Sequence, residues 1–100
     1  MQKSKLIIAA LILASTQASA ADLTFKNTSL RSIPLEIPGV MNPNLNPMSD
    51  SGVTLDKGQK IYFKYKGQRT LLLEITNQKD GDIIVINDVI AARRAELDKR

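Results

Sequence analysis

The sequence predicts a mostly β protein, a small antiparallel β-sandwich or barrel-like domain with a short C-terminal α-helix. Two segments in which apolar and polar residues alternate, 59–66 and 69–76, flank the turn Lys66-Gly67-Gln68 and predict a β-hairpin. The other short apolar stretches are separated by Gly, Pro, Asn and Asp, which interrupt regular structure. A charged segment over 88–99 has the spacing of a helix.

Residues 1–20 have the anatomy of a bacterial export signal. Two lysines near the start precede an apolar run over 6–14, and Ala18-Ser19-Ala20 offers a cleavage site of small residues. The apolar run is too short for a stable membrane-spanning helix, and the absence of cysteine excludes a thioether lipid anchor. We therefore expect one domain over 21–100 that begins at Ala21, has no transmembrane segment and is periplasmic or secreted.

Composition excludes several classes of function. The signal carries two of the fourteen basic residues, so the predicted mature chain has twelve basic and ten acidic residues and a net charge of +2. This balance gives no indication of nucleic-acid binding. The chain has no His and no Cys, which excludes Ser-His-Asp triads, cysteine nucleophiles and most zinc or blue-copper sites. We expect no cofactor and no enzymatic activity.

Two segments before residue 39 predict strands. In 21–27, Leu23 and Phe25 alternate with polar residues and are expected to point inward. Asn27-Thr28-Ser29 ends this strand; it matches an N-glycosylation pattern, but after a bacterial signal we interpret it as a turn. In 33–38, apolar residues alternate with prolines and a glutamate, which predicts an edge strand because proline cannot donate to a ladder.

The segment 39–52 predicts a long loop with two Asn-Pro dipeptides around Leu45. Proline fixes the backbone, and loops of this length are often functional or disordered. One interpretation is a rigid surface connection whose apolar residues partly pack on the sheet. The other is a presented recognition loop with Leu45 as its apolar tip. The candidate binding residues of this loop are Met41, Asn42, Asn44, Leu45, Asn46 and Met48.

A short strand over 53–55 and a turn over 56–58 lead into the hairpin. The pattern Val53-x-Leu55-x-x-Gly58-Gln59 resembles that of sandwich domains of the immunoglobulin-like and cupredoxin-like kinds. The resemblance covers this short stretch alone and implies a sandwich. A cupredoxin-type copper site requires histidine and cysteine, so the resemblance does not extend to that site.

The apolar residues of the hairpin predict its register. With a three-residue loop, Phe63 faces Leu71 across the two strands, and Leu72 points to the opposite face. A two-residue loop would pair Phe63 with Thr70, and a loop of about four or five residues is also open. We predict the three-residue loop because it keeps the apolar face continuous.

The outer face of the hairpin carries a basic stripe. One interpretation is a solvated face whose lysines prevent pairing between sheet edges. The other is a docking surface for an acidic partner protein or for anionic envelope polymers. The residues of the basic stripe are Lys60, Tyr62, Lys64 and Lys66, with Arg69 as a candidate addition to it.

The last segments predict a strand and a helix. The apolar run within 82–86 suits a strand that is buried on both sides. Asn87 or Asp88 offers an N-cap for a helix over 88–99. Basic residues near the C-terminus of this helix are favourable for its dipole.

Three weaker possibilities concern chemistry. A serine activated by a lysine is conceivable for Ser49 or Ser51 with Lys57, although serines beside glycine ordinarily form turns. Met41 and Met48 are soft enough to ligate copper(I), but gap-filling is the favoured role of methionine. Four aspartates offer oxygen ligands for calcium, although the last two favour a turn: Asp50, Asp56, Asp80 and Asp82.

Together these features predict an exported, non-catalytic binding or accessory module of the bacterial envelope that acts by protein–protein interaction. The expected partner is a protein, bound through the loop or the basic stripe, and the oligomeric state is open. One alternative is an exported inhibitor or immunity-type protein that presents the Asn/Pro loop to its target. A second alternative is a weak carrier of copper or calcium.

Overall fold

The computed structural model describes residues 20–99. The fold is mostly β with a C-terminal helix, as predicted. The predicted signal, apart from Ala20, lies outside the described residues. The elements in chain order are β1 (Ala20–Asn27), β2 (Ile33–Pro34), β3 (Asn44–Leu45), β4 (Ser49–Asp56), β5 (Lys60–Tyr65), β6 (Gln68–Glu74), β7 (Ile83–Val85) and α2 (Ile86–Asp98).

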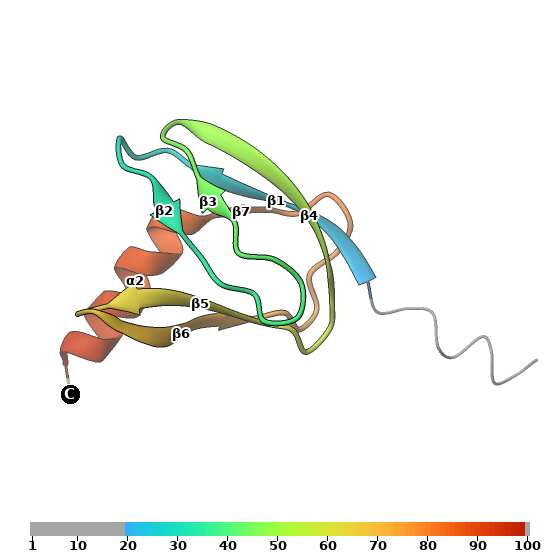
Figure 1. Cartoon of the computed structure of the whole chain (residues 1–100). Helices are drawn as coiled ribbons and strands as arrows, with labels where there is room; N and C mark the ends of the chain where they lie inside the picture. Colours follow the sequence, from blue (N-terminus) through green and yellow to red (C-terminus); the bar gives the residue numbers. More distant parts are fainter. Residues whose placement is uncertain (1–19, 100) are drawn as a thin grey trace, which may run out of the picture.

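β1 is the central strand of the largest sheet, whose order is β4-β1-β7 (Figure 1). It pairs with β4 in antiparallel orientation along its whole length, and with β7 in parallel orientation, so that Thr24 lies opposite Ile83. Leu23 and Phe25 are buried and Asp22 is exposed, which confirms the predicted alternation of β1. The sheet therefore has one face on the core and one in solvent.

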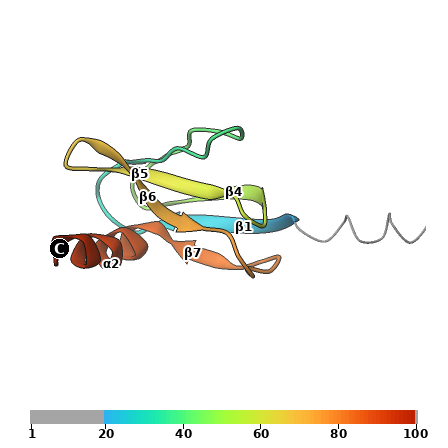
Figure 2. The same cartoon turned by 90° about the horizontal axis from the view of Figure 1, so that it is seen from below.

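Two smaller sheets complete the β structure. β2 pairs with β3, and β5 pairs with β6. Figure 2, seen from below, shows β4, β1 and β7 in succession, with α2 at one end of the molecule. The sheets are small and mixed and do not close, so the barrel-like form of the prediction is wrong. The most deeply buried apolar side chains come from β1, β3, β4, β5, α2 and two connecting segments: Phe25, Ile37, Leu45, Leu55, Ile61, Ile75 and Ile86.

The alternating segment 33–38 adopts the expected pattern, because its three apolar residues are buried while its two prolines are exposed. Only its first two residues form a ladder. Further on, Glu36 and Tyr62 exchange backbone hydrogen bonds of 3.0 and 2.8 Å, which join this segment to β5. The segment thus links the small β2–β3 sheet to the hairpin.

The predicted loop over 39–52 contains two strands. β3 places Leu45 opposite Ile33, and β4 begins at Ser49. Leu45 is 1% exposed, so the expectation that it forms an exposed apolar tip is wrong. The first half of β4 has no apolar alternation in its sequence, and it forms a strand because β1 supplies a partner along its full length.

The hairpin turn has two residues, so the predicted three-residue loop is wrong. Lys66 and Gly67 both have positive φ angles, 52° and 80°, as in the turn that matches the twist of paired strands. Phe63 consequently faces Thr70 rather than Leu71. Both strands are also slightly shorter than the predicted segments 59–66 and 69–76.

A bulge in the middle of the hairpin compensates for the shorter turn. The register shifts between Ile61 and Tyr62, so that Ile61 again lies opposite Leu73. Leu72 is the extra residue on β6, and it is buried instead of lying on the outer face as predicted. The bulge thereby brings Leu72 into the core, beside Leu73, which packs against it.

The structure differs from the prediction in the burial of β7 and in the two ends of α2. β7 is an edge strand, and Ile83 is 60% exposed, so the expected burial on both sides is wrong. The helix begins at Ile86 with no intervening loop, and Val85 at its N-cap makes no side-chain hydrogen bond. Asn87, predicted as a cap, instead bonds to Thr28. The last helical turn carries no basic residue, contrary to expectation.

Candidate functional site

The six candidate residues of the Asn/Pro loop do not form one surface. Its three asparagines are exposed, whereas Leu45 belongs to the core. Met41 is 42% exposed and lies beside β1 and β4; Met48 is 66% exposed and lies at the start of β4. The two thioethers line different cavities and do not converge on one ligand position.

The lysines of the basic stripe lie on β5 except for Lys66, which belongs to the hairpin turn. The three lysines are exposed and Tyr62 is half-buried. The Arg69 guanidinium lies 4.1 Å from the centre of the Tyr62 ring, and its Nε is 2.8 Å from Oε1 of Glu36. Lys60 lies opposite Glu74 across the hairpin, and Lys66 lies over the Tyr65 ring.

A shallow cavity of about 320 Å³ brings part of the loop next to part of the stripe. Asn42 lines it from the loop, and Tyr62 and Lys64 line it from β5, with the Glu36–Arg69 ion pair beside them. The structure therefore joins one predicted loop residue to two predicted stripe residues. The remaining candidates, including Lys60 and Lys66, lie elsewhere.

The outer edge of β4 presents backbone groups that the sheet does not use. Thr24 donates its N–H to the carbonyl oxygen of Asp82, at 3.0 Å, so the backbone groups of Thr24 point towards β7. In an antiparallel ladder, the backbone N–H and C=O groups of two paired residues either bond to each other or both point away from the partner strand. Gly52, the partner of Thr24, therefore points its N–H and C=O away from β1. The same alternation applies to Asp50 and Thr54.

An open cavity of about 570 Å³ lies over β1 and β4 and reaches this edge. Val40 and Met41, which are 44% and 42% exposed, line it together with Gly52, Val53 and Thr54. We define the β4 edge site as Val40, Met41, Asp50, Gly52 and Thr54. β4 contains no proline, no lysine and no bulge, which are three of the features that protect sheet edges; its charged residues are Asp50 and Asp56.

Sequence reasoning assigned Met41 to a loop site but missed the remaining members of the β4 edge site. The segment 49–52 contains Ser, Asp and Gly, which favour turns, so no strand was expected there. The one available signal was the alternation at 53–55, where apolar residues flank Thr54. Extended towards the N-terminus, that alternation would have placed Asp50 and Gly52 on the same face as Thr54.

Several of the polar residues considered for catalysis or calcium binding have structural partners, and the serine and lysine considered together do not meet. Ser49 and Lys57 lie at opposite ends of β4, and Asp50 forms an ion pair of 3.2 Å with Lys26. The Asp80 carboxylate accepts a hydrogen bond from the N–H of Asp22, so it fixes a turn. Within residues 20–99, no three or more Asp, Glu, His or Cys side chains gather as a metal-binding group.

Over the same range, none of the helical structure has the length and apolar character needed to cross a bilayer. The candidate binding sites in the described part of the chain are therefore exposed surfaces, the outer edge of β4 and shallow cavities. No protein-family model, curated protein or solved structure matches this chain.

Proposed function

We propose that this chain is an exported, non-catalytic binding module of the bacterial envelope that acts by protein–protein interaction. Its partner contributes an extended segment that pairs with the outer edge of β4 as a fourth strand. The observation that supports this proposal is the unused row of backbone groups at Asp50, Gly52 and Thr54 beside two exposed apolar side chains.

Strand addition fits the chemistry of the β4 edge site. Main-chain hydrogen bonds supply affinity in this mode, and pockets for alternate side chains supply specificity. Val40 and Met41 provide an apolar contact next to the edge. A Cβ atom added at Gly52 would meet no atom within 4 Å, so no other residue covers the face of the sheet at this position.

The other predicted surfaces are less suited to a protein partner. Arg69, next to the basic stripe and close to the hairpin turn, is already paired with Glu36 and stacked on Tyr62. A recognition loop anchored by Leu45 would have to remove that side chain from the core, because it is 1% exposed. The inhibitor or immunity-type alternative therefore loses its expected anchor.

Export and the finer fold class belong to the same proposal. The signal pattern over 1–20 supports export, and the intact mass of protein recovered from the periplasm should correspond to a chain that begins at Ala21. A mature species that keeps its first twenty residues would contradict it. We also propose that the layers form a variant of an immunoglobulin-like or cupredoxin-like sandwich.

A pair of substitutions at Gly52 tests strand addition. Gly52→Pro removes the outward N–H while the ladder to β1 keeps its bonds, because Gly52 points away from β1. Gly52→Ala keeps that N–H and finds free space for its methyl group. A photo-reactive methionine at position 41 should crosslink a partner in the host for wild type and Gly52→Ala, but not for Gly52→Pro.

Hydrogen exchange supplies the second measurement. With the captured partner bound, the amides of Gly52 and Thr54 should gain protection, since pairing occupies them. Equal capture by the two Gly52 variants, with no added protection at these amides, would show that the partner binds elsewhere. Both variants should first give the circular dichroism spectrum of the wild type.

A further inference from the structure

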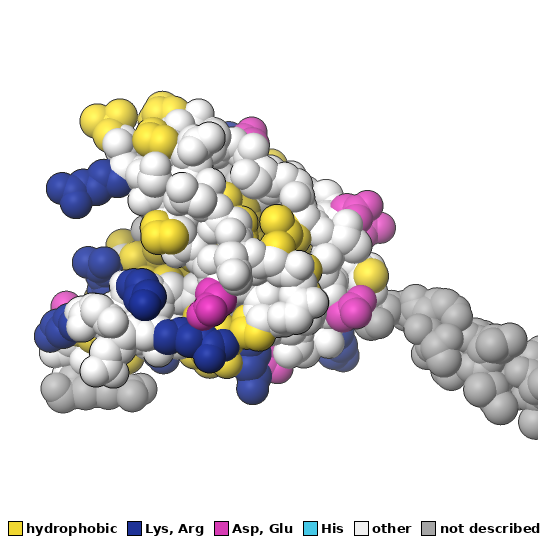
Figure 3. All heavy atoms as spheres, viewed as in Figure 1, with side chains coloured by type: hydrophobic (Ala, Val, Ile, Leu, Met, Phe, Trp, Pro, Cys, Tyr) yellow, Lys and Arg dark blue, Asp and Glu magenta, His cyan; other side chains and the backbone are white. Residues whose placement is uncertain are grey.

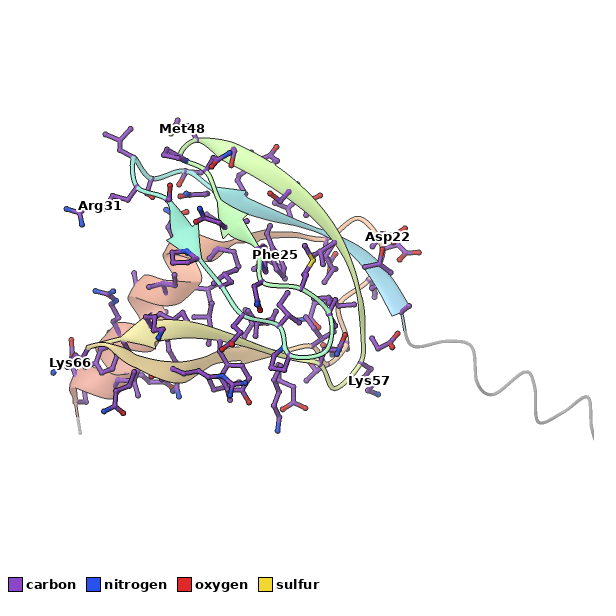
Figure 4. The ribbon with its side chains drawn as sticks, viewed as in Figure 1. Asp22, Phe25, Arg31, Met48, Lys57 and Lys66 are labelled. Atoms are coloured by element: carbon purple, nitrogen blue, oxygen red, sulfur yellow. The ribbon has the colours of Figure 1, made fainter. Side chains whose placement is uncertain are left out.

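The most exposed apolar side chains outside the β4 edge site lie together at one corner. Leu30, in the turn after β1, is 84% exposed, and Met48 is 66% exposed. The N–H of Met48 donates to the carbonyl oxygen of Ser29 at 3.2 Å, which holds the two turns side by side. We call Leu30, Pro47 and Met48 the apolar tip; Figure 4 shows Met48 and Arg31 at this corner.

Three cationic side chains line a cavity that adjoins the apolar tip at Ser29. The cavity has a volume of about 280 Å³ and lies between the turn after β1, β5 and α2. Arg31, Lys64 and Arg94 line it, and we call these residues the basic rim. Its apolar lining includes Ile33 and Phe63, and no acidic residue lines it. In Figure 3 dark-blue side chains gather on this side of the molecule.

The basic rim is not neutralised by the described part of the chain. Within residues 20–99, none of its three cations forms an ion pair. The neighbouring acids are already engaged, because Glu36 pairs with Arg69 and Glu96 pairs with Arg93. Within the described residues, unpaired positive charge and exposed apolar surface therefore lie at the same corner. An anionic group would complement the first, and an apolar environment would complement the second.

We propose that this corner docks on the surface of a membrane that contains anionic lipids. The apolar tip enters the boundary between headgroups and acyl chains, while the basic rim contacts lipid phosphates. A soluble anion in the cavity would account for the cations alone, because Leu30 does not line the cavity. A lipid surface accounts for both observations. This inference is independent of the β4 edge site and of the partner proposed there.

Sedimentation with lipid vesicles tests the proposal. Vesicles of phosphatidylcholine with and without phosphatidylglycerol are mixed with protein recovered from the host, and intact mass verifies that all variants have the same N-terminus. We expect binding to the anionic vesicles that falls with added salt, because exposed charges are screened. Leu30→Ser with Met48→Ser, and separately Arg31→Gln with Arg94→Gln, should each weaken binding about tenfold.

Matched controls come from other faces of the molecule. Ile83→Ser removes an apolar side chain that is 60% exposed on β7, and Lys57→Gln with Lys79→Gln removes two exposed cations. Lys57 lies far from the tip, towards the start of β1 (Figure 4). Both controls should bind anionic vesicles as the wild type does, and thermal melts should show that every variant is folded.

Three outcomes would overturn the proposal. The first is a folded wild type that fails to bind anionic vesicles. The second is an equal loss of binding in the controls and in the tip or rim variants, which would indicate unspecific attraction. The third is binding of a polyglutamate peptide through the basic rim in the absence of vesicle binding, which would make the corner a site for an acidic polypeptide.

Discussion

The side-chain nitrogen Nδ2 of Asn27 donates a hydrogen bond of 3.2 Å to the main-chain carbonyl oxygen of Leu45. The same nitrogen donates to the carbonyl oxygens of Arg31 and Asn46, and Oδ1 accepts from the N–H and the hydroxyl of Ser29. Asn27 is completely buried. One amide therefore joins the end of β1, the following turn and β3, in agreement with the interpretation of Asn27-Thr28-Ser29 as a turn.

Asn27→Ala should lower the free energy of unfolding by about 2–3 kcal/mol, because it leaves buried carbonyl oxygens without a donor. Asn27→Asp should cost more, since it places an acceptor against three acceptors. Urea denaturation measures both changes. Asn46→Ala is the control: its side chain is exposed and its carbonyl group is kept, so it should unfold close to the wild-type midpoint. An Asn27→Ala variant as stable as this control would show that the network is not needed.

Leu45→Asp should unfold the domain. The side chain is 1% exposed, and placing a carboxylate there costs more than about 4 kcal/mol. Met48→Asp, three residues away, should remain folded because Met48 is 66% exposed. Far-ultraviolet circular dichroism and the dispersion of amide NMR signals distinguish the two. A folded Leu45→Asp protein would show that Leu45 is exposed at the tip of the loop, contrary to the structure.

Phe63→Ala should cost roughly 3–5 kcal/mol, because the ring is 4% exposed and its removal leaves a cavity in the core. Tyr62→Ala removes a half-buried ring and its contact with Arg69, for which about 1 kcal/mol is expected from the cation–π interaction. Chemical denaturation compares the two variants. Equal losses would mean that the two faces of β5 are equally buried, contrary to the structure.

Lys66→Asn should stabilise the hairpin by about 0.5–1 kcal/mol. Lys66 has a φ of 52°, a conformation that asparagine tolerates better than lysine, and Asn-Gly is the preferred pair for this turn. Gly67→Ala should act in the opposite direction, because φ is 80° at that position. The melting temperatures of the two variants should therefore shift in opposite directions from that of the wild type.

The alternation of apolar and polar residues correctly predicted burial in β1 and β5. Leu23 and Phe25 in β1, and Ile61 and Phe63 in β5, point inward as their spacing indicates. In α2, Val89, Ile90 and Leu97 pack against the core, and their spacing in the sequence is that of one side of a helix. In these segments each residue's environment depends on its immediate neighbours in sequence.

The errors arose where a distant partner decides the conformation. Leu45 is buried because Asn27 and Ile33 hold β3 in place, and nothing near Leu45 in the sequence indicates this. Leu72 turns inward because a two-residue turn requires a bulge to restore the register. The β4 edge site was missed for the same reason. The first half of β4 has the composition of a turn, and it forms a strand because it pairs with β1.

The pairing of β1 with β7 also constrains the order of folding. Thr24 lies opposite Ile83, so the central strand of the sheet acquires its second neighbour only after most of the chain has been synthesised. Contacts so distant in sequence slow folding, because the intervening chain must close before they form. This order agrees with the export that we propose, because the chain cannot complete its sheet while its C-terminal part is still inside the ribosome.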